Sequence, residues 1–219
     1  MLRRAGVLTA VVVVVAAGPV AAQGAGIGGR VGTLGLGVEV ALDLTQRWVV
    51  RGGFGVAPLE PSATFDGIQV EVTLPRMYNV GVDYYLNGAF RIGGGVLFKR
   101  DDLRLSGSYT TAQDIGGVPT TPAELGTLTG VLDTEPRAPY ALIGFGRHTA
   151  LGAGLFIDVG VAFMGRADVQ LGAEGGTMSD QAEPLRSRLD QEAVDFEADM
   201  GRHFEFWPIV SFGFRVGLG

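Results

Sequence analysis

The chain has 219 residues, which suits one domain, and it contains no cysteine, which excludes disulfides, thiolate metal sites and a cysteine nucleophile. Its formal net charge is −6 and its basic residues form no block, so the composition argues against nucleic acid as a partner. The mean hydropathy is +0.28, but beyond the first 22 residues no segment reaches the roughly 18 apolar residues of a membrane-spanning helix. Such a chain is either an apolar soluble β protein or a β-barrel that lies in lipid.

The N-terminus has the pattern of a secretory signal peptide. Arg3 and Arg4 precede a mostly apolar run that ends at Ala17, and small residues that suit cleavage follow it. An uncleaved anchor helix is the alternative, but the apolar run is too short to cross a bilayer. We therefore assign residues 1–22 to a cleaved signal peptide and residues 23–219 to the mature barrel domain.

Apolar and non-apolar residues alternate along most of the mature chain, and a period of two is typical of β-strands. In the first clear strand Leu36 and Val38 share one face, whereas Gly37 and Glu39 share the other. A longer alternation keeps its parity across Pro75. Seven strands are predicted in this way: 34–44, 48–56, 68–86, 90–99, 139–147, 155–163 and 204–218.

The composition of the two strand faces decides the class of barrel. The non-apolar face consists mostly of Gly and Ala with single charges, which suits a crowded lumen better than a surface in water. The apolar face is therefore expected to meet lipid, and a soluble sandwich or lipocalin-like barrel is the alternative. Aromatic residues lie near the strand ends, as in an interfacial girdle: Trp48, Tyr84, Phe90, Phe163, Phe204 and Phe206.

Short and long connections alternate between the predicted strands. Three-residue turns are expected at 45–47 and 87–89, because equal parity on the flanking strands requires an odd count, and Gly88 is able to adopt a positive φ. Short turns on one side and long loops on the other are the pattern of outer-membrane barrels. A third short link is expected at about 148–154, and long loops at about 58–67, 100–137 and 165–203.

Two helices are predicted within the long loops. The segment Thr121-Pro122-Ala123-Glu124 has the pattern of a capping box with proline at the first helical position. Apolar residues recur at helical spacing from about Pro184 to Gly201, which predicts an amphipathic helix. The acidic run from Asp190 to Asp199 could bind calcium, but its helical spacing favours a solvated face.

Bacterial barrels of this kind have an even number of strands, so an eighth strand is expected. It is either the Gly-rich stretch 24–31 or a loop extension such as 169–172, and the pattern does not choose between them. The predicted fold class is all-β: an antiparallel, up-and-down transmembrane β-barrel of eight strands with short helices in the long loops.

Several stretches resemble small proteobacterial outer-membrane proteins, broadly the OmpA and OmpW barrels. They are GTLGLGVEVALDL, YNVGVDYYLNGAFRIGGGVLF, GTLTGVLD with APYALIGFG, and FIDVGVAF. Together with the C-terminal segment they cover most of the mature chain. The resemblance implies a location in the outer membrane of a Gram-negative bacterium, and it implies no particular substrate.

The C-terminus resembles the signal that the barrel assembly machinery reads. Ser211, Gly213, Val216 and Leu218 occupy its polar, glycine and two hydrophobic places. The segment lacks the usual terminal aromatic residue and ends on an additional Gly219. The resemblance implies that this machinery assembles the barrel.

The chemical motifs are weak. Residues 24–29 match G-x-G-x-x-G, but no strand precedes them and no helix follows, as a dinucleotide site requires. His148 and His203 lie near opposite strand ends, which argues against a shared metal site. His203 and Glu205 resemble part of a lipid-modifying barrel enzyme, but Ser211 is not where its nucleophile belongs. We therefore expect no enzyme activity, no cofactor and no metal.

The charged residues of the predicted lumen are the strongest candidate site. The turn register places Ala41 opposite Arg51 and Tyr85 opposite Arg91, so carboxylates lie diagonal to both arginines. Charges in a narrow lumen need partners, and the set is either a structural network, which we favour, or an ion path. The candidate residues are Glu39, Asp43, Arg51, Asp83, Arg91, Asp158 and Arg215.

These patterns lead to one main functional hypothesis and two alternatives. The main hypothesis is an integral outer-membrane barrel with a structural or surface-interaction role, whose lumen is largely closed by side chains. Its expected partners are outer-membrane lipid and lipopolysaccharide. The alternatives are a narrow channel for small or apolar solutes and a lipid-modifying barrel enzyme.

Overall fold

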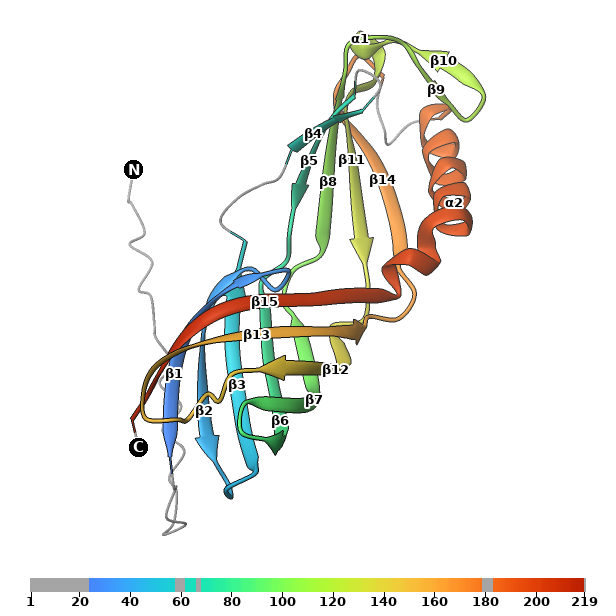
Figure 1. The fold of residues 1–219 in the computed structure, drawn as a ribbon. Coiled ribbons are helices and arrows are strands. Elements are labelled where there is room, and N and C mark those ends of the chain that lie inside the picture. Colours follow the sequence, from blue (N-terminus) through green and yellow to red (C-terminus); the bar gives the residue numbers. More distant parts are fainter. Residues whose placement is uncertain (1–23, 58–61, 66–67, 179–182, 219) are drawn as a thin grey trace, which may run out of the picture.

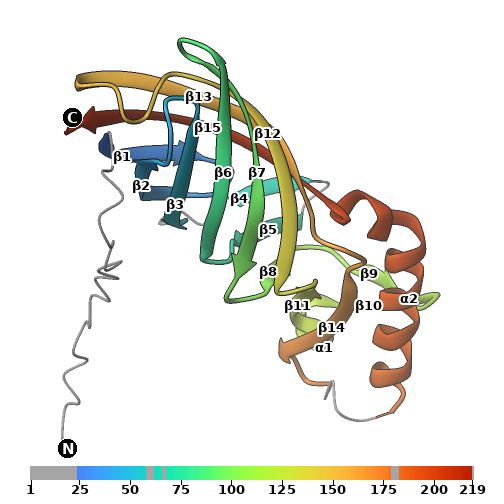
Figure 2. The ribbon, with the colours of Figure 1, turned by 90° about the horizontal axis from the view of Figure 1, so that it is seen from below.

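The computed structural model describes residues 24–57, 62–65, 68–178 and 183–218. The expected signal peptide at residues 1–22 lies outside this part of the chain. Within the described residues, the helices are too short or too polar to cross a membrane. The molecule consists of a β-barrel and an extension that continues from one end of it (Figures 1 and 2).

Eight antiparallel strands form a closed barrel, as the sequence predicts (Figure 1). Around the barrel they follow the order β1, β15, β13, β12, β7, β6, β3, β2, and β2 pairs with β1 to close the circle. Their bounds are β1 Ala25–Gly32, β2 Leu36–Asp43, β3 Trp48–Val56, β6 Met77–Asn87, β7 Phe90–Lys99, β12 Arg137–Phe145, β13 Gly152–Phe163 and β15 Phe206–Gly217.

The eighth strand of the barrel is the N-terminal one. Strand β1 pairs on one side with β15, where Gly28 lies opposite Arg215, and on the other with β2, where Gly28 lies opposite Glu39. The alternative segment, 169–172, is also part of a strand, but that strand belongs to a second sheet. The Gly-rich stretch therefore closes the barrel.

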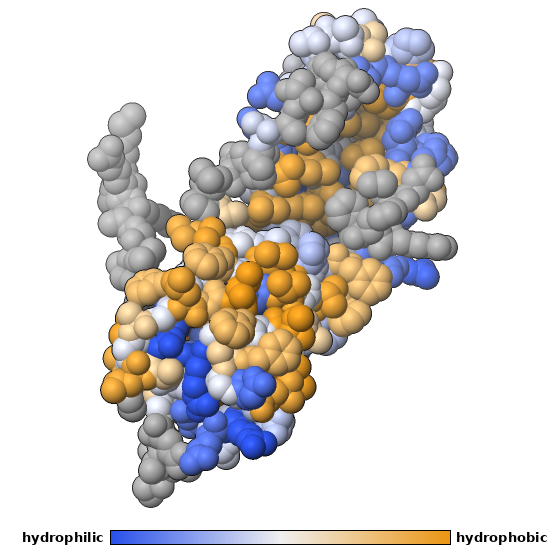
Figure 3. Space-filling model, in the orientation of Figure 1, coloured by the Kyte–Doolittle hydropathy of each residue, from blue (hydrophilic) through white to orange (hydrophobic). Residues whose placement is uncertain are grey.

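The barrel wall is polar inside and apolar outside. Along β2 the apolar residues Val38 and Val40 point outward and are exposed. Glu39 and Asp43 lie on the opposite face of the strand and are buried. Hydrophobic side chains accordingly cover much of the barrel surface in Figure 3. This is the reverse of a soluble barrel, whose large apolar side chains fill the interior.

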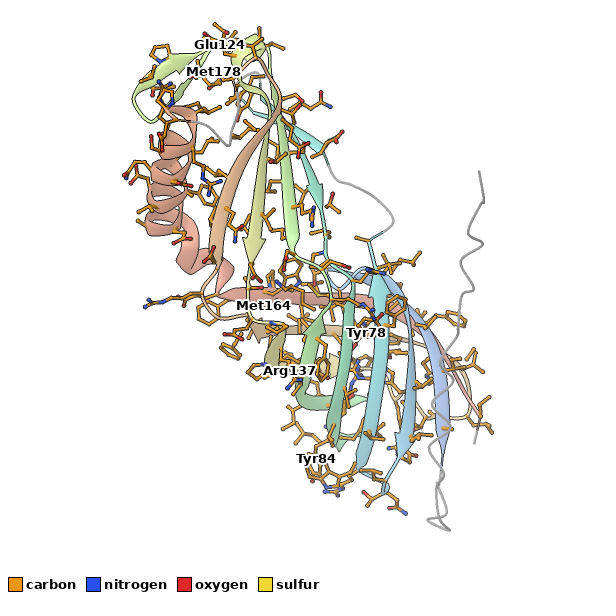
Figure 4. All side chains as sticks on the ribbon, turned by 180° about the vertical axis from the view of Figure 1, so that it is seen from behind. Tyr78, Tyr84, Glu124, Arg137, Met164 and Met178 are labelled. Atoms are coloured by element: carbon orange, nitrogen blue, oxygen red, sulfur yellow. The ribbon has the colours of Figure 1, made fainter. Side chains whose placement is uncertain are left out.

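Aromatic pairs lie near both ends of the barrel wall. Trp48 and Tyr84 lie near the short turns, with ring centroids 4.8 Å apart, and Figure 4 shows Tyr84 at that end. Phe163 and Phe206 lie at the opposite end, 5.5 Å apart. Aromatic side chains therefore lie at both ends of the wall, where the sequence predicts the two girdles.

The short turns differ in one detail from the prediction. Leu44 and Trp48 flank the expected three-residue turn, since the Leu44 N–H donates to the Trp48 carbonyl at 2.8 Å. At the next turn, however, Asn87 pairs with Phe90, so only Gly88 and Ala89 form the loop. A β-bulge after Tyr85 adds one residue to β6, so the apolar residues of β6 and β7 still lie on the same face of the wall. Gly88 has the expected positive φ, at 41°.

The three long connections, predicted as loops with helices, contain a second sheet. One predicted strand, 68–86, is broken at residues 74–76, because Pro75 cannot donate a ladder hydrogen bond. Its first half and the segment GTLTGVLD both belong to the second sheet rather than to the barrel. The sheet has the order β14 Asp168–Gly175, β11 Gly126–Asp133, β8 Leu103–Tyr109, β5 Ile68–Thr73 and β4 Ser62–Phe65, and a hairpin of β9 Gln113–Ile115 and β10 Val118–Thr120 lies beside it.

This second sheet prolongs part of the barrel wall. In the chain, β5 leads into β6, β7 into β8, β11 into β12, and β13 into β14. The order β5, β8, β11, β14 in the sheet repeats the order β6, β7, β12, β13 in the barrel. We call the sheet with its hairpin and helices the extension, and Figure 4 places Met164 at its junction with the barrel and Glu124 at its far tip.

Both predicted helices lie in the extension. Helix α1, Pro122–Leu125, begins at the predicted capping box, where the Thr121 N–H donates to the Glu124 carboxylate at 2.9 Å. Helix α2, Leu185–Phe204, ends three residues beyond the predicted Gly201. Its apolar stripe packs against the sheet, because the buried Leu185 and Leu189 belong to one apolar cluster with Ala173 of β14.

Candidate functional site

The lumen of the barrel contains a connected network of arginines and carboxylates. Arg51 on β3 lies at its centre and contacts three carboxylates. Its guanidinium is 3.4 Å from Glu39 on β2, 3.3 Å from Asp83 on β6 and 2.6 Å from Asp158 on β13. A single cation on β3 thus contacts carboxylates from three other strands of the barrel.

A second arginine contacts two of the same carboxylates. The guanidinium of Arg91 on β7 is 2.9 Å from Asp83 and 2.5 Å from Asp158. It also donates to the carbonyl of Gly146, at 2.6 Å, in the turn after β12. Five of the seven candidate residues, Glu39, Arg51, Asp83, Arg91 and Asp158, therefore belong to one network.

The ion pair between Arg51 and Asp158 crosses the full width of the barrel. Strands β3 and β13 are separated by three strands in either direction around the circle, so they lie on opposite walls. Because their side chains meet at 2.6 Å, they bridge the lumen at this level. An eight-stranded barrel has an interior just wide enough for side chains to fill, and here they fill it.

Two residues that the sequence analysis missed complete the network. Arg30 on β1 lies 3.6 Å from Glu39, and His148 contacts the same carboxylate from the turn after β12. Arg30 faces Gly37 in the β1–β2 register, so Glu39 is its diagonal neighbour, and assigning β1 would have revealed the pair. No neighbouring-strand register could have revealed His148, because it lies in a turn.

The network is buried and balanced in charge. Its members are at most 4% exposed. Three guanidinium groups face three carboxylates, so each charge has a partner of opposite sign, as buried charges require. The six charged members are Arg30, Arg51, Arg91, Glu39, Asp83 and Asp158.

The other two candidate residues hold the turn at 146–151 instead of joining the centre. Asp43 accepts a hydrogen bond from the Thr149 hydroxyl at 2.7 Å and lies 3.6 Å from Arg147. Arg215 donates to the backbone carbonyls of Ala150 and Gly152, the latter at 2.8 Å. Asp43 is the diagonal neighbour of Arg51 on β2, as the register predicts, but its side-chain contacts are to the inserted turn.

This turn fills the lumen at the short-turn end. His148 is 1% exposed, its backbone N–H donates to the Tyr85 hydroxyl at 3.1 Å, and its ring lies 4.6 Å from that of Phe156. Its ring nitrogen Nδ1 also lies 3.3 Å from the Tyr85 hydroxyl. The turn therefore forms a floor beneath the charged network.

At the opposite end, an apolar layer covers the network. Tyr140 and Leu142 lie next to the charges, and Met77, Leu97 and Ile209 lie beyond them. Each of these side chains is at most 7% exposed, and Trp207 packs against the layer. The turn at 146–151, the charged network and the apolar layer together occupy the lumen along its length.

Lumen glycines make room for the side chains that fill the barrel. A Cβ atom at Gly144 would lie 2.4 Å from the Asp158 carboxylate and 2.6 Å from the Arg91 guanidinium. At Gly93 it would lie 2.1 Å from the Asp83 carboxylate, and at Gly213 it would lie 2.3 Å from a ring carbon of Phe156. These glycines permit close packing, in line with the role of glycine in strands.

The residues considered for enzyme chemistry do not form a site among the described side chains. Ser211 faces the lumen and is 2% exposed, while Glu205 lies 3.9 Å from the exposed Arg166. The side chain of His203 lies outside the described part of the structure. Within that part, no three His, Asp or Glu side chains gather as a metal ion would require.

The residues of the C-terminal segment lie on both faces of β15. Ser211 and Gly213 are buried and face the lumen, whereas Leu218 is 66% exposed and follows the strand on the outer side. Val216 is half-buried on that outer side. The segment pairs with both β1 and β13, so it closes the barrel.

Comparisons with known proteins find similarity in structure only. No family model matches the sequence, and no curated protein matches it. Two crystal structures of Acinetobacter baumannii proteins are similar. CarO2 has a TM-score of 0.62 and 17% identity, covering 89% of this chain and 98% of its own, and CarO has a TM-score of 0.59 and 16% identity, covering 87% and 96%.

The chain shares the CarO fold. Because the alignments cover most of this chain, they extend beyond the barrel strands into the extension. The expected eight-stranded antiparallel barrel is therefore confirmed, and the CarO structures share this fold. At such low identity the likeness concerns the fold alone.

Proposed function

We propose that this protein is an integral outer-membrane barrel of a Gram-negative bacterium, that its lumen is closed, and that it acts through its extension as a structural or surface-interaction protein. The observation that carries the proposal is the ion pair of Arg51 with Asp158 across the barrel. A transport path would have to break this pair and displace the layers on both sides of it. The extension then remains as the part that meets other molecules.

The barrel wall supports the membrane location. Exposed Val, Leu, Ile and Phe side chains surround the barrel, and lipid is the surrounding in which such a surface is stable. Lipid and lipopolysaccharide are thus the partners of the wall. Since short turns face the periplasm in such barrels, the extension projects from the cell.

Planar-bilayer recording tests the closed lumen. The purified protein should give little or no steady conductance, because charged and apolar side chains fill the barrel. Large, stable single-channel currents would contradict the proposal and favour the narrow channel for small or apolar solutes. An unmodified porin reconstituted in the same lipid serves as the positive control.

Membrane fractionation tests the location. The mature protein should be recovered with the outer membrane and should begin near Gln23 if the signal peptide is cleaved as expected. Recovery in the soluble periplasmic fraction would contradict the membrane location. Mass analysis of outer-membrane lipid from a deletion strain should show no missing lipid modification, and a missing species would favour the lipid-modifying enzyme.

Assembly by the barrel assembly machinery is a further part of the proposal. Leu218 extends beyond the end of β15 on the outer face, where a hydrophobic residue of the assembly signal belongs. Replacing Leu218 by Ser should lower the fraction of assembled barrel in cells. The matched control is Leu44→Ser at a turn on the same side of the barrel, which should assemble normally.

A further inference from the structure

The extension contains an apolar cavity of about 240 Å³ between its sheet and helix α2. Alternate residues of the sheet, such as Leu105 on β8 and Leu128 on β11, point into it, and Phe196 of α2 lies opposite them. Figure 3 shows hydrophobic side chains on the extension as well as on the barrel. The cavity is smaller than the roughly 300–1,000 Å³ typical of pockets for drug-sized ligands.

The cavity is accessible and is separate from the barrel lumen. Val70, Leu105, Leu128 and Leu171 line it and are only half-buried, so the cavity is open to the surroundings. The apolar layer that contains Leu97 lies between it and the charged network. A molecule bound here would therefore sit at the mouth of the barrel without entering the lumen.

Two glycines create the space on the sheet side. Gly107 and Gly130 lie on neighbouring strands and are buried within the lining. A Cβ atom at Gly130 would lie 3.5 Å from the Leu171 side chain and 3.6 Å from Leu105, which is ordinary contact. A larger side chain therefore fits here without a backbone clash, so the empty volume is a consequence of glycine at this position.

One carboxylate marks the edge of the cavity. Glu192 of α2 is half-buried in the lining, and its carboxylate accepts a hydrogen bond from the Gly116 N–H at 2.8 Å. That contact ties the side chain to the β9–β10 hairpin. Tyr109 lies nearby, and burial, together with the charge of Glu192, raises the pKa of its hydroxyl. The cavity thus combines an apolar body with one fixed anionic group.

We propose that this cavity binds a small amphiphile with an apolar body and a cationic amine. The apolar part would replace water against Leu105, Leu128 and Leu171, where burial is favourable. The ammonium group would meet Glu192, because a charge-assisted hydrogen bond is stronger than a neutral one. The site lies in the extension and its binding does not depend on whether the barrel conducts.

Three probes that share a phenyl body but differ in charge test the proposal. They are 2-phenylethylamine, 2-phenylethanol and 3-phenylpropanoate, and binding to the full mature protein in lipid nanodiscs is measured by NMR titration and equilibrium dialysis. The amine should bind saturably and about tenfold more tightly than the alcohol, and the acid should bind most weakly. Empty nanodiscs correct for partition into lipid.

Variants separate the two parts of the site. Glu192→Gln should remove the preference for the amine over the alcohol, because the amide keeps the size of the side chain and lacks its charge. Gly130→Val should fill the cavity and abolish saturable binding of both probes, whereas Thr129→Val, on the opposite face of the same strand, should bind as the unmodified protein does. If Gly130→Val fails to fold, Leu105→Phe fills the same space from the neighbouring strand.

Two results would overturn the proposal. One is equal binding to the unmodified protein and to a folded cavity-filling variant, which would mean partition into lipid alone. The other is an unchanged amine preference in Glu192→Gln. Neither result bears on the closed lumen or on the membrane location, because conductance and fractionation test those independently.

Discussion

The extension continues four strands of the barrel wall, yet the inner and outer faces of the two regions have opposite character. On β7 the inner face carries Arg91 and the outer face carries Ile92, which is 46% exposed. On β8, which follows it, Leu105 lies on the inner, cavity-lining face, and the exposed Arg104 lies on the outer face. Within a few residues the wall changes from apolar outside to apolar inside.

The proposed membrane location accounts for this reversal. In lipid the outer face gains nothing from polar groups, so the charges gather inside and pair with one another. In water the apolar side chains must be covered, so they turn toward α2 and the charges turn outward. If the barrel lies in the membrane as we propose, the wall leaves it at the breaks 74–76, 100–102, 134–136 and 164–167.

The largest effect is expected from removing the central cation of the lumen. Arg51→Met should destabilise the barrel by about 3–5 kcal/mol, because it leaves Glu39, Asp83 and Asp158 with too few partners in a buried site. Urea unfolding in detergent, followed by heat-modifiable gel mobility, measures the change. Val50→Met, on the outer face of the same strand, is the control and should cost less than about 1.5 kcal/mol.

A double variant sharpens this test. Arg51→Met combined with Asp158→Leu removes one charge of each sign, so it should be more stable than Arg51→Met alone. The network would not stabilise the barrel if Arg51→Met unfolded at the same urea concentration as the unmodified protein.

The second prediction places the same side chain on the outer face of both regions. Val159→Arg, on the lipid side of β13, should cost about 2–4 kcal/mol if it lies near the bilayer midplane. Ser108→Arg, at an exposed position on the outer face of β8 in the extension, should change the stability by about 0.5 kcal/mol or less. Urea unfolding in lipid vesicles measures both, and equal costs would mean that both faces meet the same medium.

The sequence predicts the barrel better than the extension, and the reason lies in the strands themselves. Alternation with period two identifies strands such as 48–56, but it says nothing of which partners they pair with. LRLSGSY of β8 alternates as clearly as any barrel strand, yet it lies in a segment that the turn pattern marks as a loop. Only the order of strands around the barrel reveals that it continues the wall.

The candidate site shows the same limit. Register on neighbouring strands brings Asp83 beside Arg91, and the structure has that contact at 2.9 Å. The contact of Arg51 with Asp158 joins strands on opposite walls, and neighbouring-strand register cannot reach it. The turn that carries His148 folds inward because Asp43 and Arg215 hold it, which depends on the closed barrel.

The third prediction concerns the space around the network. Gly144→Ala should destabilise the barrel by about 1–3 kcal/mol, because its Cβ would press on Asp158 and Arg91. Gly29→Ala on the outer wall is the matched control, since its Cβ would meet nothing nearer than 3.9 Å. If both variants unfolded at the same urea concentration, the lumen around Gly144 would have space for a methyl group, and the tight packing at this glycine would be contradicted.

The smallest effect is expected at the boundary between the two regions. Lys99, at the end of β7, lies 2.8 Å from Asp102, and the hydrogen bond from its ammonium group holds the pKa of that carboxyl below its ordinary value. A depressed pKa stabilises the folded state above the ordinary value of about 3.9, and this contribution is lost as the pH falls through the folded-state value. The unmodified protein should therefore exceed Asp102→Asn in stability at about pH 6, and the difference should shrink below about pH 4. Urea midpoints of both proteins across this range measure it. If the stability difference between the two proteins stayed constant with pH, the contact with Lys99 would not depend on the charge of Asp102. The ion pair at this solvated boundary would then contribute nothing through charge, unlike the buried pair of Arg51 with Asp158.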